Sequence, residues 1–388
     1  MKFSIYSEIQ WWPGKEPAQL YSEVLEQIQN ADRLGFDAYA VIEHFFFPKF
    51  SSSPDPIALF AAAAQRTQRI NFRTLVHVLP YHNPMVLASR IAFADVLLGG
   101  RYEFGVGRGH GWIPWRAGIA YSEMVERYDE SLEILFTALE SGGEPISYEG
   151  KFYTVNDARI VPPPTRKFRV FTGGTSDKTY VLAGTNGWGV VVPPLLPYEA
   201  LREQLDVYRA TCAEHGNEPD IVWIHACYLD EDRDTAIREA EQGVTGFLAG
   251  NASPLVEHEK PPAEELTAAG YGFYTAGILE GLAQMPYDEM ISGDVVWVGT
   301  PEDVIERIET VCEVCEGLTE ISITVNPGGF DHWKAIKNQE LFARRVMPHF
   351  KAAAPRDPRP RSPERTWQGS DPLTIARAPR PPRAGPGR

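Results

Sequence analysis

Two glycine-rich segments of the chain carry residue types that bind phosphate. Residues 105–111 read GVGRGHG, where a glycine at every second position lets the backbone approach a ligand and Arg108 offers a fork of donors. Residues 172–176 read TGGTS and, together with Thr179, precede or open a helix whose free N–H groups and hydroxyls favour an anion. Either segment alone is as typical of a tight turn. Together they predict a site for a phosphate-bearing ligand.

A histidine beside an apolar run is the candidate for proton transfer. His44 is followed by three phenylalanines, residues 45–47. Burial against such side chains disfavours the charged imidazole, which keeps His44 neutral near pH 7 and suited to moving a proton. A lone histidine is more often structural, so the residue type alone does not assign catalysis. His77, His82 and His110 also fall near the ends of expected strands.

The elements that position these residues alternate along the chain. Short β-branched or aromatic runs predict strands at 2–9, 38–45, 70–79, 102–107, 168–173, 188–192, 220–229 and 320–326. Amphipathic stretches predict helices near 17–34, 55–68, 84–98, 121–141, 176–185, 197–215, 232–248, 300–316 and 333–350. Eight strand–helix units favour a (β/α)8 TIM barrel over an open sheet. Functional residues of such a barrel lie at the carboxyl ends of its strands, where both glycine-rich segments fall.

Two segments interrupt the alternation. Residues 143–167 hold SYEGKFYTV between turn signals, which predicts a small hairpin before the fifth strand. Residues 249–295, here called the insertion, follow the seventh strand and are rich in Gly, Pro, Tyr and Phe. An insertion at the carboxyl end of a barrel is where a lid over an active site is built. The alternative is a surface excursion with a minor helix.

The charge of the chain is divided unevenly. Its 388 residues carry a formal net charge of −15, from 37 basic and 52 acidic residues. Residues 355–388 hold eight Arg against three acids, and nine Pro, so they carry +5 and are predicted to be a disordered tail. Residues 1–354, the predicted barrel domain, therefore carry −20. A body of that charge repels phosphate backbones, so nucleic acid is not expected as a partner.

Several other classes of protein are disfavoured. The first residues, MKFSIYSEIQ, do not resemble an export signal, and no apolar run reaches membrane-spanning length, which predicts a cytoplasmic protein. The CxxC of Cys312 and Cys315 falls in an expected helix with no further ligands nearby, so reduced structural thiols are the interpretation. No HExxH is present, and no metal is expected. A GxSxG motif is also absent, which disfavours a serine hydrolase.

Seven motifs in a fixed order resemble one family of enzymes. They are ADRLGFDAYAVIEHF, RINFRTLVHVLPYHNP, GGRYEFGVGRGHG, SYEGKFY, VFTGGTSDKT, VGTPEDVIERI and FARRVMPHF. Over roughly residues 1–350 the chain resembles the bacterial luciferase-like flavin-dependent monooxygenases. The resemblance implies a (β/α)8 barrel that binds reduced FMN (FMNH2) supplied by a separate flavin reductase. The flavin would react with O2 to a C4a-hydroperoxyflavin, which oxygenates an organic substrate.

The resemblance also implies roles for individual residues. His44 matches a histidine implicated in the flavin-peroxide chemistry, and Arg108, Arg127, Ser176 and Thr179 would hold the FMN phosphate. An unusual cis non-prolyl peptide, frequent on the third strand of the family, would fall at Leu75–Val76. The complete set expected to contact the cofactor is Leu75, Val76, Gly107, Arg108, Arg127, Gly174, Thr175, Ser176 and Thr179.

Two departures from the luciferases bear on the substrate. Phe45 stands where they have a second histidine, and Gly107 stands where they have a reactive cysteine. We therefore expect oxygenation of a small apolar or aromatic molecule and not light emission from a long-chain aldehyde. A flavin peroxide survives only where water is excluded, so an aromatic wall is expected. The predicted substrate pocket comprises Trp11, Phe45, Phe46, His77, His110, Trp112 and Tyr274; core packing is the alternative for each aromatic.

Two other functions remain open from the residues. The same barrel family includes F420-dependent oxidoreductases, which transfer hydride without O2 and whose cofactor carries a long anionic tail. A non-catalytic flavin-binding partner subunit is the third possibility, although His44 and the phosphate set disfavour it. Family resemblance also favours a homodimer.

Overall fold

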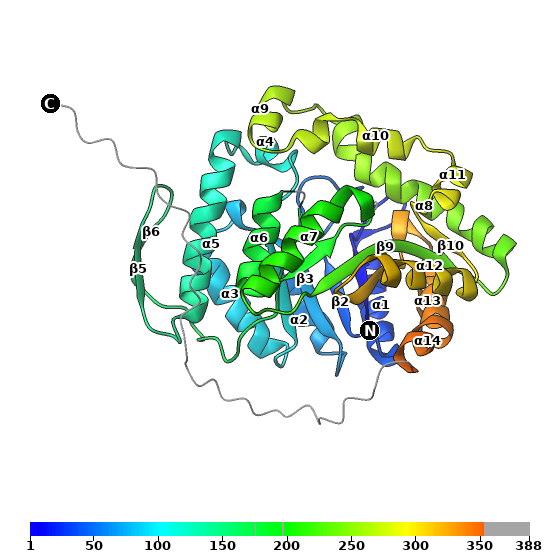
Figure 1. The fold of residues 1–388 in the computed structure, drawn as a ribbon, viewed down its shortest axis with the longest axis horizontal. Helices are drawn as coiled ribbons and strands as arrows, with labels where there is room; N and C mark the ends of the chain where they lie inside the picture. Colours follow the sequence, from blue (N-terminus) through cyan, green and yellow to red (C-terminus); the bar gives the residue numbers. More distant parts are fainter. Residues whose placement is uncertain (175, 196–197, 353–388) are drawn as a thin grey trace.

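A computed structural model describes residues 1–174, 176–195 and 198–352 of the chain. Eight parallel strands close into a barrel in the order β1–β2–β3–β4–β7–β8–β9–β11, and β11 pairs back with β1. Most helices surround this barrel on its outside (Figure 1). The predicted (β/α)8 barrel is confirmed, and the predicted tail at 355–388 lies outside the described residues.

The strands that close the barrel all fall within or close to the predicted runs. They are β1 (Lys2–Ser7), β2 (Ala38–Val41), β3 (Asn71–Val78), β4 (Tyr102–Gly107), β7 (Val170–Thr172), β8 (Gly189–Val192), β9 (Ile221–Leu229) and β11 (Leu318–Thr324). A short strand that the sequence did not predict, β10 (Trp297–Gly299), pairs in parallel with the end of β9.

The helices that follow the strands begin at well-marked positions. They are α1 (Pro17–Leu34), α2 (Pro56–Ala64), α3 (Pro84–Leu97), α4 (Ile113–Ala117), α5 (Met124–Glu140), α6 (Asp177–Asn186), α7 (Tyr198–Glu214), α8 (Arg233–Val256), α12 (Pro301–Val314), α13 (His332–Leu341) and α14 (Met347–Ala352). At α12, Thr300 and Asp303 form the reciprocal bonds of a capping box. A π-helical turn, η5 (Phe342–Val346), separates α13 from α14 inside the helix predicted at 333–350.

Strand β1 and helix α8 end at residues other than those predicted. Strand β1 was predicted to reach residue 9, but it ends at Ser7 because Ile9 adopts a left-handed backbone conformation, with φ of 51°. Helix α8 was predicted to end near residue 248, before a segment that contains glycine, asparagine and proline. It continues to Val256, since its last turns are buried against the barrel, and this packing outweighs the low helix propensity.

The excursion at 143–167 contains the predicted hairpin. Strands β5 (Ile146–Glu149) and β6 (Thr154–Ala158) pair antiparallel and lie outside the ring of helices, beside α5 (Figure 1). The carboxylate of Glu130 on α5 accepts hydrogen bonds from the backbone N–H groups of residues 151–153 in the hairpin turn. This anchor fixes the hairpin to the barrel.

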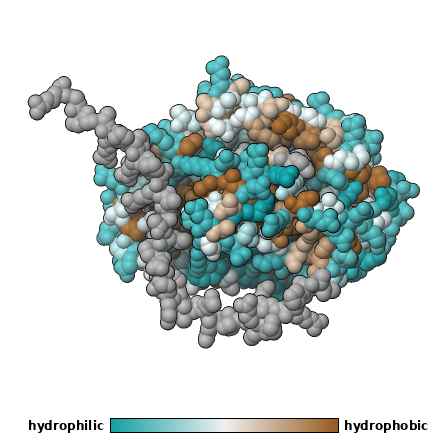
Figure 2. Space-filling model, in the orientation of Figure 1, coloured by the Kyte–Doolittle hydropathy of each residue, from teal (hydrophilic) through white to brown (hydrophobic). Residues whose placement is uncertain are grey.

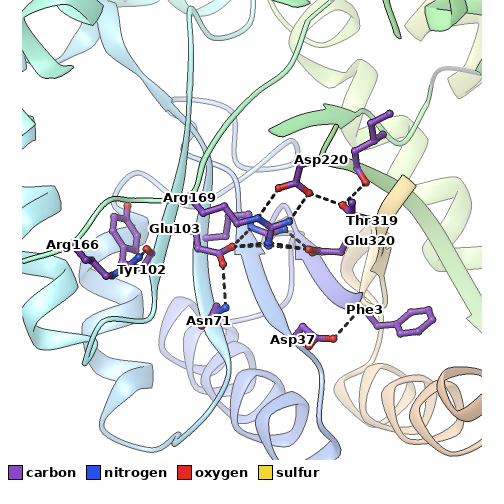
Figure 3. Close-up of polar contacts among 12 residues, drawn as sticks. Phe3, Asp37, Asn71, Tyr102, Glu103, Arg166, Arg169, Asp220, Thr319 and Glu320 are labelled. Atoms are coloured by element: carbon purple, nitrogen blue, oxygen red, sulfur yellow. Dashed lines mark hydrogen bonds and ion pairs between the residues drawn. The ribbon is translucent and has the colours of Figure 1, made fainter. Parts of the chain in front are cut away.

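An ion-pair network fills the barrel interior at the amino ends of the strands. Arg73 on β3 is fully buried, donates to the Glu103 carboxylate at 2.8 Å, and meets Glu320 of β11 at 2.7 and 3.1 Å. Arg169, just before β7, extends the network to Glu320 and to the carboxylate of Asp220, as Figure 3 shows. Charges at this depth are tolerated because each is paired at hydrogen-bond distance.

Across the described ranges, every helix is too short or too polar to cross a lipid bilayer.

The network predicts a large loss of stability when its central cation is removed. Arg73→Met should lower the free energy of unfolding by about 3–5 kcal/mol, because Glu103 and Glu320 would keep their charges in the interior without this partner. Urea denaturation followed by circular dichroism measures the change. The matched control is Arg33→Met, whose pair with Glu340 is solvent-exposed and should contribute less than about 1 kcal/mol.

The pair of Arg73 and Glu320 also predicts how the stability of the wild type and of Arg73→Met depends on pH. Burial opposes ionisation of Glu320, but Arg73 outweighs it and lowers the pKa of Glu320 to about 2. A lowered pKa means that the pair stabilises the wild type above the ordinary glutamate range and that this stability is lost as the pH falls toward 2. The wild type should therefore lose more stability than Arg73→Met over that range. Equal losses would contradict a role for the buried pair.

Candidate active site

A cavity of about 340 Å³ opens at the carboxyl ends of the barrel strands. Its wall is built from the strand ends, from the loops that follow them and from the insertion. The principal lining residues are Tyr6, Glu8, Glu43, Phe50, Leu75, Val76, Gly107, Arg108, His110, Trp112, Tyr128, Gly173, Gly174, Ser176, Thr179, Asn251, Tyr271, Tyr274 and Leu279. This is the end of the barrel where the sequence predicted the site.

Among the described residues that line this cavity, Arg108 is the one cation. Its Nη1 donates to the carbonyl of Ala269 at 2.8 Å, and its guanidinium lies 4.8 Å from the ring centre of Tyr271. Both partners belong to the insertion, and no acid of the described residues pairs with Arg108. The charge is therefore held in place but not neutralised, which leaves it available to an anionic ligand.

The amino end of α6 lies on the same wall. Ser176 is the N-cap of α6, but its hydroxyl makes no capping bond and instead lies 2.9 Å from the Thr179 hydroxyl. Ser176 is exposed and Thr179 is partly buried, and both line the cavity beside the first N–H groups of the helix. Free N–H groups, hydroxyls and the helix dipole are the donors that bind a phosphate. Thr175, also expected to contact the cofactor, lies outside the described residues.

The floor of the cavity is made by β3 and β4. The peptide between Leu75 and Val76 is cis, as expected, and both residues line the cavity. A Cβ on Gly107 would lie 2.5 Å from Val76, and one on Gly105 would lie 2.7 Å from it. A Cβ on Gly109 would meet Val78 at 2.5 Å.

These close approaches correct the interpretation of the glycine repeat. The sequence suggested that its glycines admit a ligand, but at three positions they make room for valine side chains of β3. At the fourth, Gly111, a Cβ would meet side chains of the insertion, the nearest 2.9 Å away. The repeat is required first by packing. The two glycines that also line the cavity are Gly107 and Gly109.

His44 lies behind the cavity wall. Its ring contacts Phe50, His110 and Trp112, which do line the cavity, whereas His44 itself is 1% exposed and does not. The indole Nε1 of Trp112 donates to His44 Nε2 at 3.0 Å, so that nitrogen is an acceptor and the ring proton belongs on Nδ1. Burial and the neighbouring His110 hold the pKa of His44 well below its ordinary value. His44 is thus neutral, with an unpartnered Nδ1–H.

Besides His44, five of the predicted site residues do not line the cavity. Arg127 pairs with Glu123 at 2.6 Å and lies over the ring of Phe152, where it holds the hairpin. The others are Trp11, Phe45, Phe46 and His77, none of which lines the cavity. The Trp11 indole donates to the carbonyl of Lys15, and Phe46 is 57% exposed.

His77 is part of a buried cluster that the sequence did not reveal. The Glu43 carboxylate lies 3.2 Å from His77 Nδ1, 2.8 Å from His82 Nε2 and 2.8 Å from the backbone N–H of Val78, which donates to it. Burial alone raises the pKa of Glu43, but the two imidazoles outweigh it and hold that pKa well below its ordinary value. The three side chains offer metal-ligating atoms within 4.8 Å of one another, although each of these atoms already has a hydrogen-bond partner.

Other lining residues were missed for lack of a motif. Glu8, Tyr128 and Asn251 come from the end of β1, from α5 and from α8, respectively. The insertion adds Tyr271 and, besides the predicted Tyr274, neighbours from η3 (Gly272–Thr275) and α10 (Ile278–Ala283), between the short helices α9 (Ala263–Ala268) and α11 (Tyr287–Ser292). Figure 2 shows apolar side chains gathered on the outer surface over α10.

A family model described as luciferase-like monooxygenase matches residues 1–314. The chain belongs to this family. It is 27% identical to a 5,10-methylenetetrahydromethanopterin reductase of Archaeoglobus fulgidus over 86% of this chain and 98% of that protein. It is 24% identical to the oxygenase component of a flavin-dependent trigonelline monooxygenase of Acinetobacter baylyi, over 90% of this chain and 96% of that protein.

Among solved structures, a monooxygenase of Streptomyces bottropensis superposes on the chain with a TM-score of 0.75. The two are 25% identical, and the match covers 90% of this chain and 100% of that one. This luciferase-like chain therefore has both monooxygenase and reductase relatives, and its membership of the family supports an oxidoreductase.

The packing of the cavity floor predicts which glycine-to-alanine substitutions destabilise the protein. Gly107→Ala should destabilise the protein by about 1–3 kcal/mol, because the added Cβ overlaps Val76. In a protein that already carries Val76→Ala, the overlapping methyls are gone. There, Gly107→Ala should cost much less stability than it does in the wild type. Thermal unfolding of the four proteins measures the coupling. Gly281→Ala, in open space on α10, is the control and should be neutral or stabilising. Strictly additive losses would contradict packing as the reason for Gly107.

Proposed function

We propose that this chain is the oxygenase component of a two-component monooxygenase that uses reduced FMN and O2. A separate flavin reductase would supply the reduced flavin, and the substrate would be a small, largely apolar organic molecule. The observation that carries the proposal is Arg108, a fixed cation without an acid partner, beside the open amino end of α6 in one cavity. The monooxygenases among the relatives support the same reaction class.

The residues present fit an FMN molecule. Arg108, Ser176 and Thr179 would hold the phosphate, and the Leu75–Val76 floor offers an apolar surface to the ring system. When bound, reduced FMN would supply the electrons that activate O2. The rest of the chain's contribution is to orient the flavin and to exclude water. Phe50, Trp112 and Tyr274 suit this second task, because aromatic walls keep water from reactive oxygen species.

His44 would act through its Nδ1–H. Its Nε2 is occupied by the Trp112 donor, so His44 is not arranged as a base at that atom. A neutral imidazole in an apolar surrounding can instead donate one hydrogen bond from Nδ1 without bringing a charge into the site. Since His44 is separated from the cavity by Phe50, His110 and Trp112, this role requires a shift of those rings.

A hydride-transferring reductase is the second candidate, favoured by the 27% identity to the Archaeoglobus fulgidus reductase. Its cofactor would be the deazaflavin F420, whose long anionic tail needs several cations along its groove. Among the described residues, the cavity wall offers one cation, Arg108. One cation suits a single phosphate better than a long anionic tail.

Rapid mixing of the protein–FMNH2 complex with O2 tests the proposed reaction. The complex should form a transient absorbing species that free FMNH2 does not form under the same conditions. His44→Ala should bind FMNH2 as tightly as the wild type. The fraction of the consumed O2 that it releases as H2O2 should be at least about ten-fold higher than in the wild type, which is the effect of losing one contact that positions a proton. Reoxidation kinetics unchanged by the protein, together with tight binding of F420, would favour the reductase instead.

The phosphate site predicts a loss of affinity that depends on the phosphate. Arg108→Met should weaken FMN binding by about ten-fold or more, because one charge-assisted contact is lost. Binding of riboflavin, which lacks the phosphate, should not change. Arg127→Met is the matched control and should leave the affinity for both flavins unchanged, since Arg127 is held on the hairpin. Fluorescence titration of the wild type and both variants with both flavins measures these constants. Equal losses for FMN and riboflavin in Arg108→Met would contradict the assignment.

A further inference from the structure

A buried carboxyl group on the far wall of the cavity has no part in the proposed flavin site. Glu8 follows β1, and β1 lies four strands away from β7 around the barrel in either direction, opposite the wall of Ser176 and Thr179. The side chain is 4% exposed and lines the cavity. In the described part of the chain no Lys, Arg or His pairs with it.

Two amides bind one oxygen of this carboxyl group and leave the other free. Glu8 Oε2 accepts from Gln10 Nε2 at 3.2 Å and from Asn251 Nδ2 at 3.0 Å. Oε1 makes no hydrogen bond with any described residue and is not among the fully covered polar atoms. Its small exposed surface therefore opens into the cavity.

The orientation of both amides is fixed by other bonds. The same two nitrogens also donate to the carbonyl of Phe247, from Gln10 at 3.3 Å and from Asn251 at 3.0 Å. Gln10 Oε1 accepts from the backbone N–H of Gly328 at 2.9 Å. Neither amide can turn its oxygen toward Glu8 without losing these bonds, so both present N–H groups to Oε2.

These surroundings determine where a proton resides. Burial raises the pKa of Glu8 to about 8, against the two amide hydrogen bonds. The group is then a neutral carboxylic acid near pH 7. Because Oε2 already accepts two N–H donors, the acid proton belongs on Oε1 and is presented to the cavity.

The backbone at this point is held in a costly conformation. Ile9, a β-branched residue, has a φ of 51°, in the left-handed region that such residues rarely adopt. The turn comes directly after Glu8 and directs Gln10 toward α8. Strain of this kind is found where a site requires a particular placement of side chains.

We propose that the Glu8 Oε1–H group is a hydrogen-bond donor to the substrate and that it selects molecules carrying a neutral acceptor, such as a carbonyl oxygen, on an apolar skeleton. The proposal rests on the proposed function in assuming that the substrate shares this cavity with the flavin. An anionic group would be disfavoured at this wall, because the described residues that bind Glu8 are neutral amides and none of them is a cation. An ammonium group would need Glu8 to be ionised.

Three probes of similar shape test this selectivity at pH 7: acetophenone, ethylbenzene and benzylamine. Their dissociation constants are measured by NMR titration of the full-length protein, with and without FMN. The wild type should bind acetophenone about five-fold more tightly than ethylbenzene, the size of one neutral hydrogen bond. Glu8→Gln should keep this preference, because its amide oxygen can accept from Gln10 and Asn251 while its NH2 donates into the cavity. Glu8→Leu should lose it.

A second measurement covers the case in which Glu8→Leu does not fold. Acetophenone labelled with ¹³C at its carbonyl should show a downfield shift when bound to the wild type and to Glu8→Gln, because the carbonyl accepts a hydrogen bond. No shift in the wild type would overturn the proposal. A preference for benzylamine that Glu8→Gln abolishes would also overturn it, and so would equal affinity for acetophenone in all three proteins.

The binding readouts do not depend on the oxygenation reaction. If acetophenone is preferred but the protein does not change the reaction of FMNH2 with O2, the proposed function fails and the role of Glu8 stands. If the oxygen reaction is observed and the preference is absent, only the role of Glu8 fails. Weaker FMN binding in Glu8→Leu, with the acetophenone preference intact, would assign Glu8 to the cofactor and overturn the proposal.

Discussion

The buried ion pair of Arg73 and Glu103 fixes how β3 pairs with β4, and the cavity floor nearer the carboxyl ends of these strands depends on that pairing. These two residues are direct register partners on β3 and β4, and Arg73 also reaches across the interior to Glu320 on β11. A one-residue slip of β3 would leave buried charges unpaired, at a cost of several kcal/mol per ion, so the register is strongly specified. The buried charges at the amino end of the barrel thus allow few other registers of β3.

That register determines the floor of the cavity. Immediately beyond Arg73, the pairing between β3 and β4 shifts at the segment from Thr74 to His77, which contains the cis peptide. Val76 then lies against Gly105 and Gly107 instead of against side chains. The glycine repeat is therefore a consequence of how β3 passes β4. The floor is apolar because the Val76 side chain fills the space that side chains at positions 105 and 107 of β4 would otherwise occupy.

The half of the site that lies next to strand ends in sequence could be predicted, and the half built by distant contacts could not. Arg108 and Ser176 follow their strands directly, so local motifs found them. Glu8 was hidden inside a run that resembles a strand, and its partner Asn251 is 243 residues away. No sequence pattern reveals a pair of that separation.

Neighbouring residues on one element were also hard to separate. Arg127 and Tyr128 are adjacent on α5, but a helix turns by about 100° per residue, so only Tyr128 faces the cavity. The three consecutive phenylalanines at 45–47 cannot all face one side either. Phe47 is buried and Phe46 is exposed. The residue types suggested an aromatic wall, and the backbone decided which rings belong to it.

The two acids of the cavity wall differ in charge because their partners differ. Glu43 lies between two imidazoles and a backbone N–H, which favour the carboxylate. Glu8 lies between two neutral amides in a buried setting, which favours the acid. The Glu8 acid therefore offers a hydrogen-bond donor without a positive charge, whereas Arg108, directly after β4, attracts anions. A phosphate-bearing cofactor at Arg108 and a separate neutral, oxygen-bearing substrate at Glu8 would satisfy both groups, whereas a single anionic substrate would not.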